Sequence, residues 1–217
     1  MDFAGAFTAS NFMFLLEGFG VTLKIALISI VLSFLIGGVV AILRYAKIPV
    51  VSQLLAIVVD IIRNLPLLLI ILFIYLGLPE VLGYSLDITF AAITALTVFE
   101  SAMISEVVRS GLNSIEKGQI EAGRSSGLSY IQTLWHIILP QALRRMVPPI
   151  VSQFISLLKD TSLAVVIALP ELTHHAQIIN ARNTHYVIPI FLLVMVMYFA
   201  VNFALSLLAR RLELKTG

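Results

Sequence analysis

Long apolar runs, interrupted by few polar residues, are the main pattern of this 217-residue chain. A helix that crosses a membrane needs about 20 consecutive, mostly apolar residues. The segments that reach this length are approximately residues 20–43, 54–78, 88–108, 146–168 and 187–209. The pattern therefore predicts an all-α integral membrane protein, a single domain of five transmembrane helices.

The second of these segments is the least regular. Asp60, Arg63, Asn64 and Pro66 precede the apolar run 67–78. Proline has no amide hydrogen to donate within a helix, so the helix is expected to break or kink near Asn64. Arg63 has two possible partners, the carboxylate of a substrate or Asp60 one helical turn earlier.

The composition excludes several other classes of protein. Hydrophobic residues make up 59% of the chain and charged residues 12%, whereas about a quarter of the residues are charged in a soluble domain. A net charge of +2 is too small to indicate nucleic-acid binding. The absence of cysteine excludes disulfides, thiolate metal sites and cysteine nucleophiles.

The basic residues are distributed unevenly about the five predicted spans. Those on one side are Arg44, Lys47, Arg109, Lys117, Arg124, Arg144, Arg145, Arg210, Arg211 and Lys215. Because cytoplasmic loops carry an excess of Lys and Arg, this side is predicted to be cytoplasmic, with the N-terminus outside and the C-terminus inside. Asp2 stands where a signal peptide would have basic residues, so no cleaved signal is expected.

Residues 110–145 form a more polar loop between the third and fourth spans. Apolar or small residues recur there at three- and four-residue steps, namely Ile120, Gly123, Gly127, Ile131, Leu134 and Ile138. This spacing predicts one amphipathic helix, which Pro140 should end. Since glycine is unfavourable inside a helix, Gly123 and Gly127 predict a close approach of another segment or a bend. Amphipathicity alone also fits a helix that lies on the membrane surface.

A motif within this loop favours a helix that another segment approaches closely over a helix that lies on the membrane surface. Glu121-Ala122-Gly123 is followed by three residues, Gly127, nine residues and Ile137-Ile138-Leu139-Pro140. This order resembles the EAA loop of ABC importer membrane subunits, with Gly123 in place of the usual alanine. The segments that resemble the polar amino-acid permease family of these importers are 63–68, 105–112, 118–119, 138–144 and 159–163. The resemblance extends from about residue 20 to the end of the chain.

The resemblance implies a type I ABC importer fold in the bacterial inner membrane. The chain would act with a second membrane subunit, identical or different, with two ATPase subunits that hold ATP and Mg²⁺, and with an extracytoplasmic binding protein. It would move a polar amino acid, with glutamine or glutamate preferred, across the lipid bilayer by alternating access. The residues expected to contact the ATPase are Glu121, Ala122, Gly123, Arg124 and Gly127. The chain contains no G-x-x-x-x-G-K-[ST] loop, so we expect a non-catalytic subunit without a cofactor of its own.

Ionisable residues inside the predicted spans are candidates for substrate binding, because burying a charge in a bilayer is costly. Glu100 and Asp160 are expected at similar depth on antiparallel helices, where an acidic side chain can pair with the ammonium group of an amino acid. Asp160 is the preferred partner of this ammonium group. The further candidates are Ser101, Thr161 and Ser162, whose hydroxyls could instead bond to their own helix, and Arg63.

The sequence leaves two alternative functions open. Glu100 and Asp160 could bind ions in a secondary transporter or channel. Glu171, His174 and His175 have spacings at which a carboxylate and an imidazole can share a helix face, as in a metal site or an intramembrane hydrolase. Their spacing does not match H-E-x-x-H, and no metal site is expected.

Overall fold

The structure, a computed structural model, describes residues 1–216, with side chains described through Arg211. Its α-helices are α1 (Phe3–Ala6), α2 (Ala9–Tyr45), α3 (Val51–Asn64), α4 (Leu67–Leu72), α5 (Leu78–Leu82), α6 (Ile88–Asn113), α7 (Lys117–Ser125), α8 (Tyr130–Thr133), α9 (Leu139–Asp160), α10 (Leu172–Arg182) and α11 (Val187–Thr216). Its π- and 3-10 helices are η1 (Phe73–Gly77), η2 (Leu134–Ile138), η3 (Thr161–Ile167) and η4 (Thr184–Tyr186). No strand occurs among the residues described.

Four helical runs are long and apolar enough to cross a membrane, namely Ala9–Tyr45, Ile88–Asn113, Tyr130–Ile167 and Thr184–Arg211. A fifth span exists if α3 and the run Leu67–Leu82 are taken together, although they meet at an angle of 104°. The order of these runs follows the predicted one. Helix α2, which contains the first predicted span, starts well before residue 20, because the Thr8 side chain accepts a hydrogen bond from the Asn11 amide and caps the helix.

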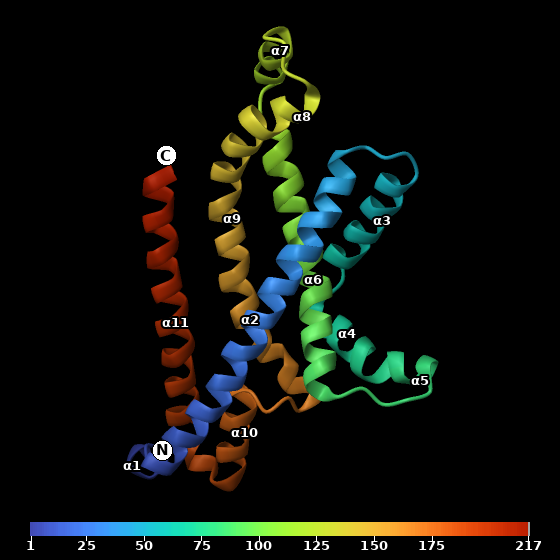
Figure 1. Ribbon diagram of the computed structural model, residues 1–217. Coiled ribbons are helices and arrows are strands. Elements are labelled where there is room, and N and C mark those ends of the chain that lie inside the picture. The colour runs from blue at the N-terminus through green and yellow to red at the C-terminus, as the bar shows by residue number, and fades with distance from the viewer. Residues whose placement is uncertain (217) are drawn as a thin grey trace.

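The break in the second segment is confirmed. Leu65 and Pro66 have extended backbones between α3 and α4, since a residue before proline avoids the helical region. Asn64 closes the end of α3 by donating its side-chain amide to the carbonyl oxygen of Asp60 at 2.7 Å. Figure 1 shows α4 and α5 turning away from the direction of α3.

Helices α2 and α6 pack along one another through the centre of the molecule (Figure 1). Small residues on α6, including Ala91, Ala92 and Ala95, are fully buried in the main apolar core. At the lower end in Figure 1, α10 lies beside the first turns of α2 and beside α11. At the opposite end α7 and α8 stand above the ends of α6 and α9, so the predicted loop 110–145 projects from the helical body.

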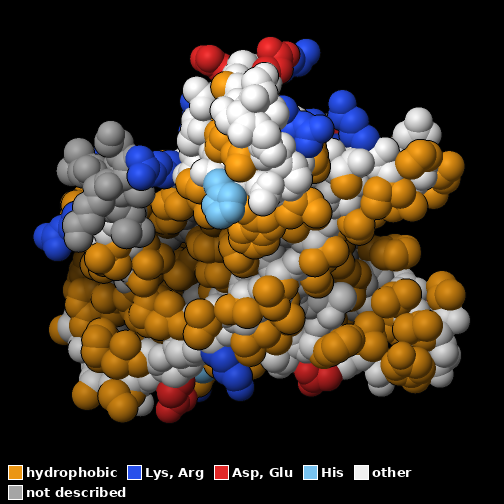
Figure 2. All heavy atoms as spheres, turned by 45° about the horizontal axis from the view of Figure 1, so that its top comes forward, with side chains coloured by type: hydrophobic (Ala, Val, Ile, Leu, Met, Phe, Trp, Pro, Cys, Tyr) orange, Lys and Arg blue, Asp and Glu red, His pale blue; other side chains and the backbone are white. Residues whose placement is uncertain are grey.

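The outer surface is apolar over a broad belt. Figure 2 shows this belt in orange, with charged side chains gathered on the projection above it and at the lower edge. Leu27, Val39 and Phe199 are each more than half exposed. Such a belt fits a surface that faces lipid hydrocarbon.

Candidate functional site

The projecting loop is a helix–turn–helix whose turn is closed by Gly127. Gly127 has φ of +85°, a backbone conformation that favours glycine. The Leu128 amide donates to the Gly123 carbonyl at 3.2 Å, and the Gly127 amide donates to the Arg124 carbonyl at 3.1 Å. These two bonds form a Schellman motif that ends α7.

The next helix begins two residues later with a capping box. The Ser129 hydroxyl accepts from the Gln132 amide at 3.2 Å, and the Gln132 side chain accepts from the Ser129 amide at 2.8 Å. The prediction of one continuous amphipathic helix is therefore wrong. The bend expected at the glycines occurs at Gly127, and it resets the helical phase between α7 and α8.

Pro140 does not end the second helix, which is also contrary to the prediction. The helical path continues from Tyr130 through η2 and α9 to Asp160. Pro140 is the second residue of α9 and directly follows the π-helical turn of η2. A wider turn is a common way for a helix to accommodate a missing backbone hydrogen bond.

The close approach expected at a glycine occurs at Gly123. This residue is buried, and a Cβ atom on it would lie 2.7 Å from Ile137 Cδ1 and 3.0 Å from Thr133 Cγ2. Helix α7 is thereby held against the beginning of the helical run that becomes α9.

The remaining predicted coupling residues lie on the outside of the loop. Glu121, Ala122, Arg124 and Gly127 are exposed. Next to them are large exposed side chains that the sequence pattern did not single out as surface residues, Tyr130, Ile131 and Trp135. The sequence pattern assigned Ile131 to the same face as Gly123, but the phase change at Gly127 turns it outward. The loop thus presents both charged and apolar groups on one projection.

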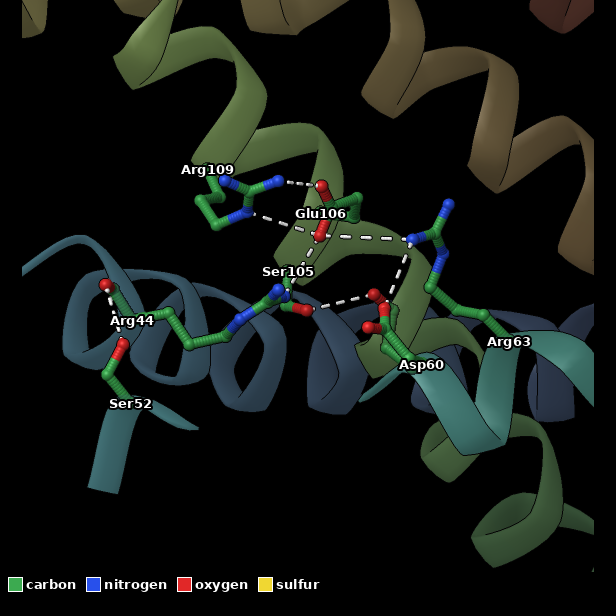
Figure 3. Close-up of polar contacts among 8 residues, drawn as sticks. Arg44, Ser52, Asp60, Arg63, Ser105, Glu106 and Arg109 are labelled. Atoms are coloured by element: carbon green, nitrogen blue, oxygen red, sulfur yellow. Dashed lines mark hydrogen bonds and ion pairs between the residues drawn. The ribbon is translucent and has the colours of Figure 1, made fainter. Parts of the chain in front are cut away.

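A second polar cluster centres on Glu106 of α6 (Figure 3). Arg44 Nη1 lies 2.9 Å from Glu106 Oε2, and the Arg109 guanidinium contacts both carboxylate oxygens. Arg63 Nη1 is more distant, at 3.8 Å from Glu106 Oε2 and 3.9 Å from Asp60 Oδ1. Three helices, α2, α3 and α6, therefore meet at one carboxylate.

This cluster was not predicted as a site from the sequence. The three-residue spacing of Glu106 and Arg109 was a local signal for one of its ion pairs. Arg63, a candidate for binding substrate, lies beside Asp60 and Glu106. Glu106 is six residues from Glu100, which corresponds to about 9 Å along a helix.

Glu100 is buried without a counter-ion among the side chains described. It is 1% exposed, and its Oε1 atom has no hydrogen-bond partner in residues 1–211. The hydroxyls of Thr97 and Ser101, on the same face of α6, are buried and likewise unpaired within the described side chains. Asp160 lies near enough for its charge to act on Glu100. The two acidic residues predicted at similar depth therefore lie within electrostatic range of each other, on helices α6 and α9 that pack together.

Asp160 occupies the point where α9 gives way to η3. The hydroxyl of Thr161 donates to the Leu158 carbonyl and that of Ser162 to the Lys159 carbonyl, both at 2.7 Å. These two hydroxyls bond to their own helical run. Their oxygens keep lone pairs that can accept a further hydrogen bond.

Glu171, His174 and His175 have contacts that fix the fold. Glu171 caps α10 by accepting from the His174 amide at 2.8 Å, and it accepts from the Tyr198 hydroxyl at 3.1 Å. The ring of His175 stacks on Phe14 with centroids 4.0 Å apart, and its Nδ1 lies 2.6 Å from the Phe14 carbonyl oxygen. The cluster thus joins α10 to α2 and α11.

Residues 34–216 match the family of binding-protein-dependent transport system inner membrane components. The chain belongs to this family. It is the permease subunit of an ABC importer and a multi-pass protein of the inner membrane. Permeases of this family act together with ATPase and substrate-binding partners.

Two curated relatives resemble the permease over nearly its whole length. It is 67% identical over 217 residues to the probable glutamine ABC transporter permease protein GlnP of Bacillus subtilis (strain 168), with 99% of each chain covered. It is 39% identical to the probable glutamine ABC transporter permease protein GlnM of the same strain, over 94% of this chain and 95% of the relative.

Two solved structures have the same fold. An amino acid ABC transporter crystallised with histidines superposes with a TM-score of 0.92 at 26% identity, over 99% of both chains. The inward-facing MetNI methionine ABC transporter superposes with a TM-score of 0.75 at 23% identity, over 94% of this chain and 99% of that chain. The permease therefore has the predicted type I importer fold.

Proposed function

We propose that the permease forms the membrane pathway of an ATP-driven importer of glutamine. The observation that carries this proposal is the 67% identity, over nearly the whole of both chains, to a probable glutamine permease. Two membrane subunits would line the pathway, and two ATPase subunits would supply the energy, binding ATP and Mg²⁺. The permease itself has no phosphate-binding loop.

The α7–α8 loop is the surface that meets the ATPase in this proposal. Glu121, Ala122 and Arg124 are exposed on it, and Gly123 holds α7 against Thr133 and Ile137. Closure of the ATPase pair would move α7 and, through this contact, α9. Because α9 ends at Asp160, the motion would reach the residues proposed to hold substrate.

This assignment also orients the chain. The α7–α8 end would be cytoplasmic, in agreement with the many basic residues on that side. The N-terminus would lie outside and the C-terminus inside. The binding protein would deliver substrate at the opposite end, where α1 and α10 lie (Figure 1).

Glu100 and Asp160 would bind the ammonium group of the amino acid. A buried carboxylate that lacks a counter-ion is costly, and a ligand that brings a positive charge removes this cost. The unpaired hydroxyls of Ser101 and Thr97 would add hydrogen bonds to the polar part of the substrate. Thr161 and Ser162 would add acceptors at the level of Asp160.

The proposal is tested in proteoliposomes that contain the permease, its ATPase and its binding protein. Glu121→Lys should reduce glutamine uptake by about tenfold or more, equivalent to ~1.4 kcal/mol of coupling, while ATP hydrolysis continues. Glu80→Lys makes the same charge change at an exposed position on α5 and should leave the ratio of uptake to hydrolysis unchanged. An equal ratio of uptake to ATP hydrolysis in Glu121→Lys and in wild type would contradict the assignment of the α7–α8 loop as the surface that contacts the ATPase.

Asp160→Asn tests the substrate residues in the same preparation. Uptake should fall severalfold while the complex assembles normally, because the neutral amide cannot balance an ammonium group. Glu17→Gln, at an exposed position on α2, is the matched control. Glutamine uptake without ATP by the permease alone would instead favour an ion-coupled transporter.

A further inference from the structure

An open cleft of about 330 Å³ lies at the α7 end of the helical body, between α6 and α9. Its polar lining consists of Arg63, Glu106, Ser110, Ser114, Arg145 and Gln153. The cleft is separate from the Glu100 and Asp160 pair, since Glu106 is about 9 Å further along α6 than Glu100. It therefore forms a second polar environment within the molecule.

The charges around this cleft do not balance. Arg63, Arg145 and Glu106 line the cleft, and Arg44, Arg109 and Asp60 lie beside it through ion pairs with Glu106 or Arg63. The four guanidinium groups exceed the two carboxylates by two positive charges. Glu106 already contacts three of the arginines (Figure 3). The cleft consequently attracts an anion rather than a cation.

Two of these arginines are placed to hold that anion. Arg44 is committed to Glu106, because its side chain is 7% exposed and lies 2.9 Å from the carboxylate. Arg63 is 36% exposed, and its distances of 3.8 and 3.9 Å from the two acids exceed that of a hydrogen bond. Arg63 therefore keeps donors for a ligand.

Arg145 stands on the other wall of the cleft. Its Nη1 atom donates to the backbone carbonyl of Ser114, at the end of α6, and lies 3.2 Å from the Ser114 hydroxyl. These bonds fix one edge of an exposed guanidinium, which has five N–H groups in all. A guanidinium held in this way suits a planar carboxylate, which it can contact through two parallel hydrogen bonds.

We propose that the cleft is an exit site that binds the α-carboxylate of the transported amino acid through Arg63 and Arg145. This inference rests on the proposed function. Glu100 and Asp160 bind the ammonium group first, deeper in the pathway, and the cleft takes the carboxylate as the substrate moves toward the cytoplasm. Ser110 and Gln153 add neutral hydrogen-bonding groups. The opposite charges of the two sites suit the two charged ends of a zwitterion.

The absence of cysteine from the sequence makes a direct test possible. Ser110→Cys places one thiol in the cleft, and Ser10→Cys places one at an exposed position outside it. The assembled importer is treated with a methanethiosulfonate carrying either a sulfonate or a trimethylammonium group, and the mass of this chain reports labelling. The ratio of labelling by the anionic reagent to labelling by the cationic reagent should be about fivefold higher at Ser110→Cys than at Ser10→Cys. Gln153→Cys, on the α9 wall, is a second reporter.

Ligands and variants identify the group that is bound. L-Glutamine should slow labelling of Ser110→Cys, whereas L-glutaminamide, which lacks the carboxylate, should not. Adding Arg63→Gln or Arg145→Gln should abolish this protection and reduce the preference for the anionic reagent. Lys47→Gln removes one exposed positive charge outside the cleft lining and should change neither result.

The outcomes separate this inference from the proposed function. Equal labelling by both reagents, or equal protection by glutamine and glutaminamide, would overturn the exit site even if ATP-driven uptake is intact. If the wild-type complex shows no ATP-driven glutamine uptake, the proposed function fails whatever the labelling pattern.

Discussion

The backbone carbonyl oxygen of Ser101 lies directly against Gly37, so that a Cβ atom on Gly37 would stand 2.7 Å from it. The side chain of Ile104 would be only 3.1 Å away. Helices α2 and α6 thus cross here with their backbones in contact, an approach that small residues allow in membrane helices. Gly38, the next residue, has no atom within 4 Å of its Cβ position. The two adjacent glycines therefore have different roles.

Gly37→Ala should destabilise the permease by about 1–3 kcal/mol, because the added methyl group meets a backbone atom that cannot rotate away. Gly38→Ala should be neutral or stabilise α2 by up to ~1 kcal/mol through helix propensity. Thermal unfolding of the two purified variants in the same detergent compares them. Equal unfolding temperatures for the two variants would show that the crossing is looser than the contact distances indicate.

Gly127→Ala should weaken the turn between α7 and α8 by about 1–2 kcal/mol, because φ of +85° is strained for alanine. The Leu128 amide, which bonds to Gly123, should then exchange hydrogen faster, and uptake per ATP hydrolysed should fall. Gly118→Ala is the matched control within α7, since its Cβ position is open and its φ is not positive. Unchanged exchange at Leu128 in Gly127→Ala would contradict this role for the glycine.

The sequence predicted the features that depend on neighbouring residues. Apolar runs of sufficient length located the spans, and Pro66 located the break after Asn64, because both signals are local to one segment. Gly123 and Gly127 correctly indicated a close approach and a bend. The pattern could not assign the close approach to one glycine and the bend to the other, since both residues have the same unfavourable effect inside a helix.

The grouping of three arginines around Glu106 could not be predicted in the same way. Arg44 lies 62 residues from Glu106 in the sequence, and periodicity relates residues only within a helix. The pairing depends on how α2 crosses α6 at Gly37, which the sequence alone does not determine. Likewise, the outward position of Ile131 depends on the change of phase at Gly127.

Glu106→Gln should destabilise the permease by about 1–3 kcal/mol, because it leaves the buried Arg44 guanidinium without a charged partner. Asp60→Asn removes an acid whose side chain is 63% exposed and 3.9 Å from Arg63, so we expect less than about 0.5 kcal/mol. Chemical or thermal unfolding in detergent measures both. The double variant Arg44→Met with Glu106→Gln should be less destabilised than the sum of the two single variants, because each removes the same pair. A strictly additive result would show that Glu106 acts independently of Arg44.

The buried carboxylate of Glu171 should make folding depend on pH. Glu171 is 0% exposed and lies between the fourth and fifth predicted spans. Burial raises its pKa above the ordinary value, and hydrogen bonds from the backbone of α10 and from Tyr198 oppose this rise only in part. The folded state therefore holds the proton more tightly than the unfolded state. At pH values below the unfolded pKa of about 4.3 both states are protonated, and this residue adds no pH dependence.

As the pH rises above about 4.3, the unfolded state loses its proton first, so the free energy of unfolding falls until the folded pKa is passed. Glu171→Gln removes this loss, so its stability relative to wild type should improve as the pH is raised. Unfolding curves of the two proteins measured from pH 4 to 8 test this, with the exposed Glu80→Gln as control. A difference that is constant over this range would mean that the pKa of Glu171 is the same in the folded and unfolded states.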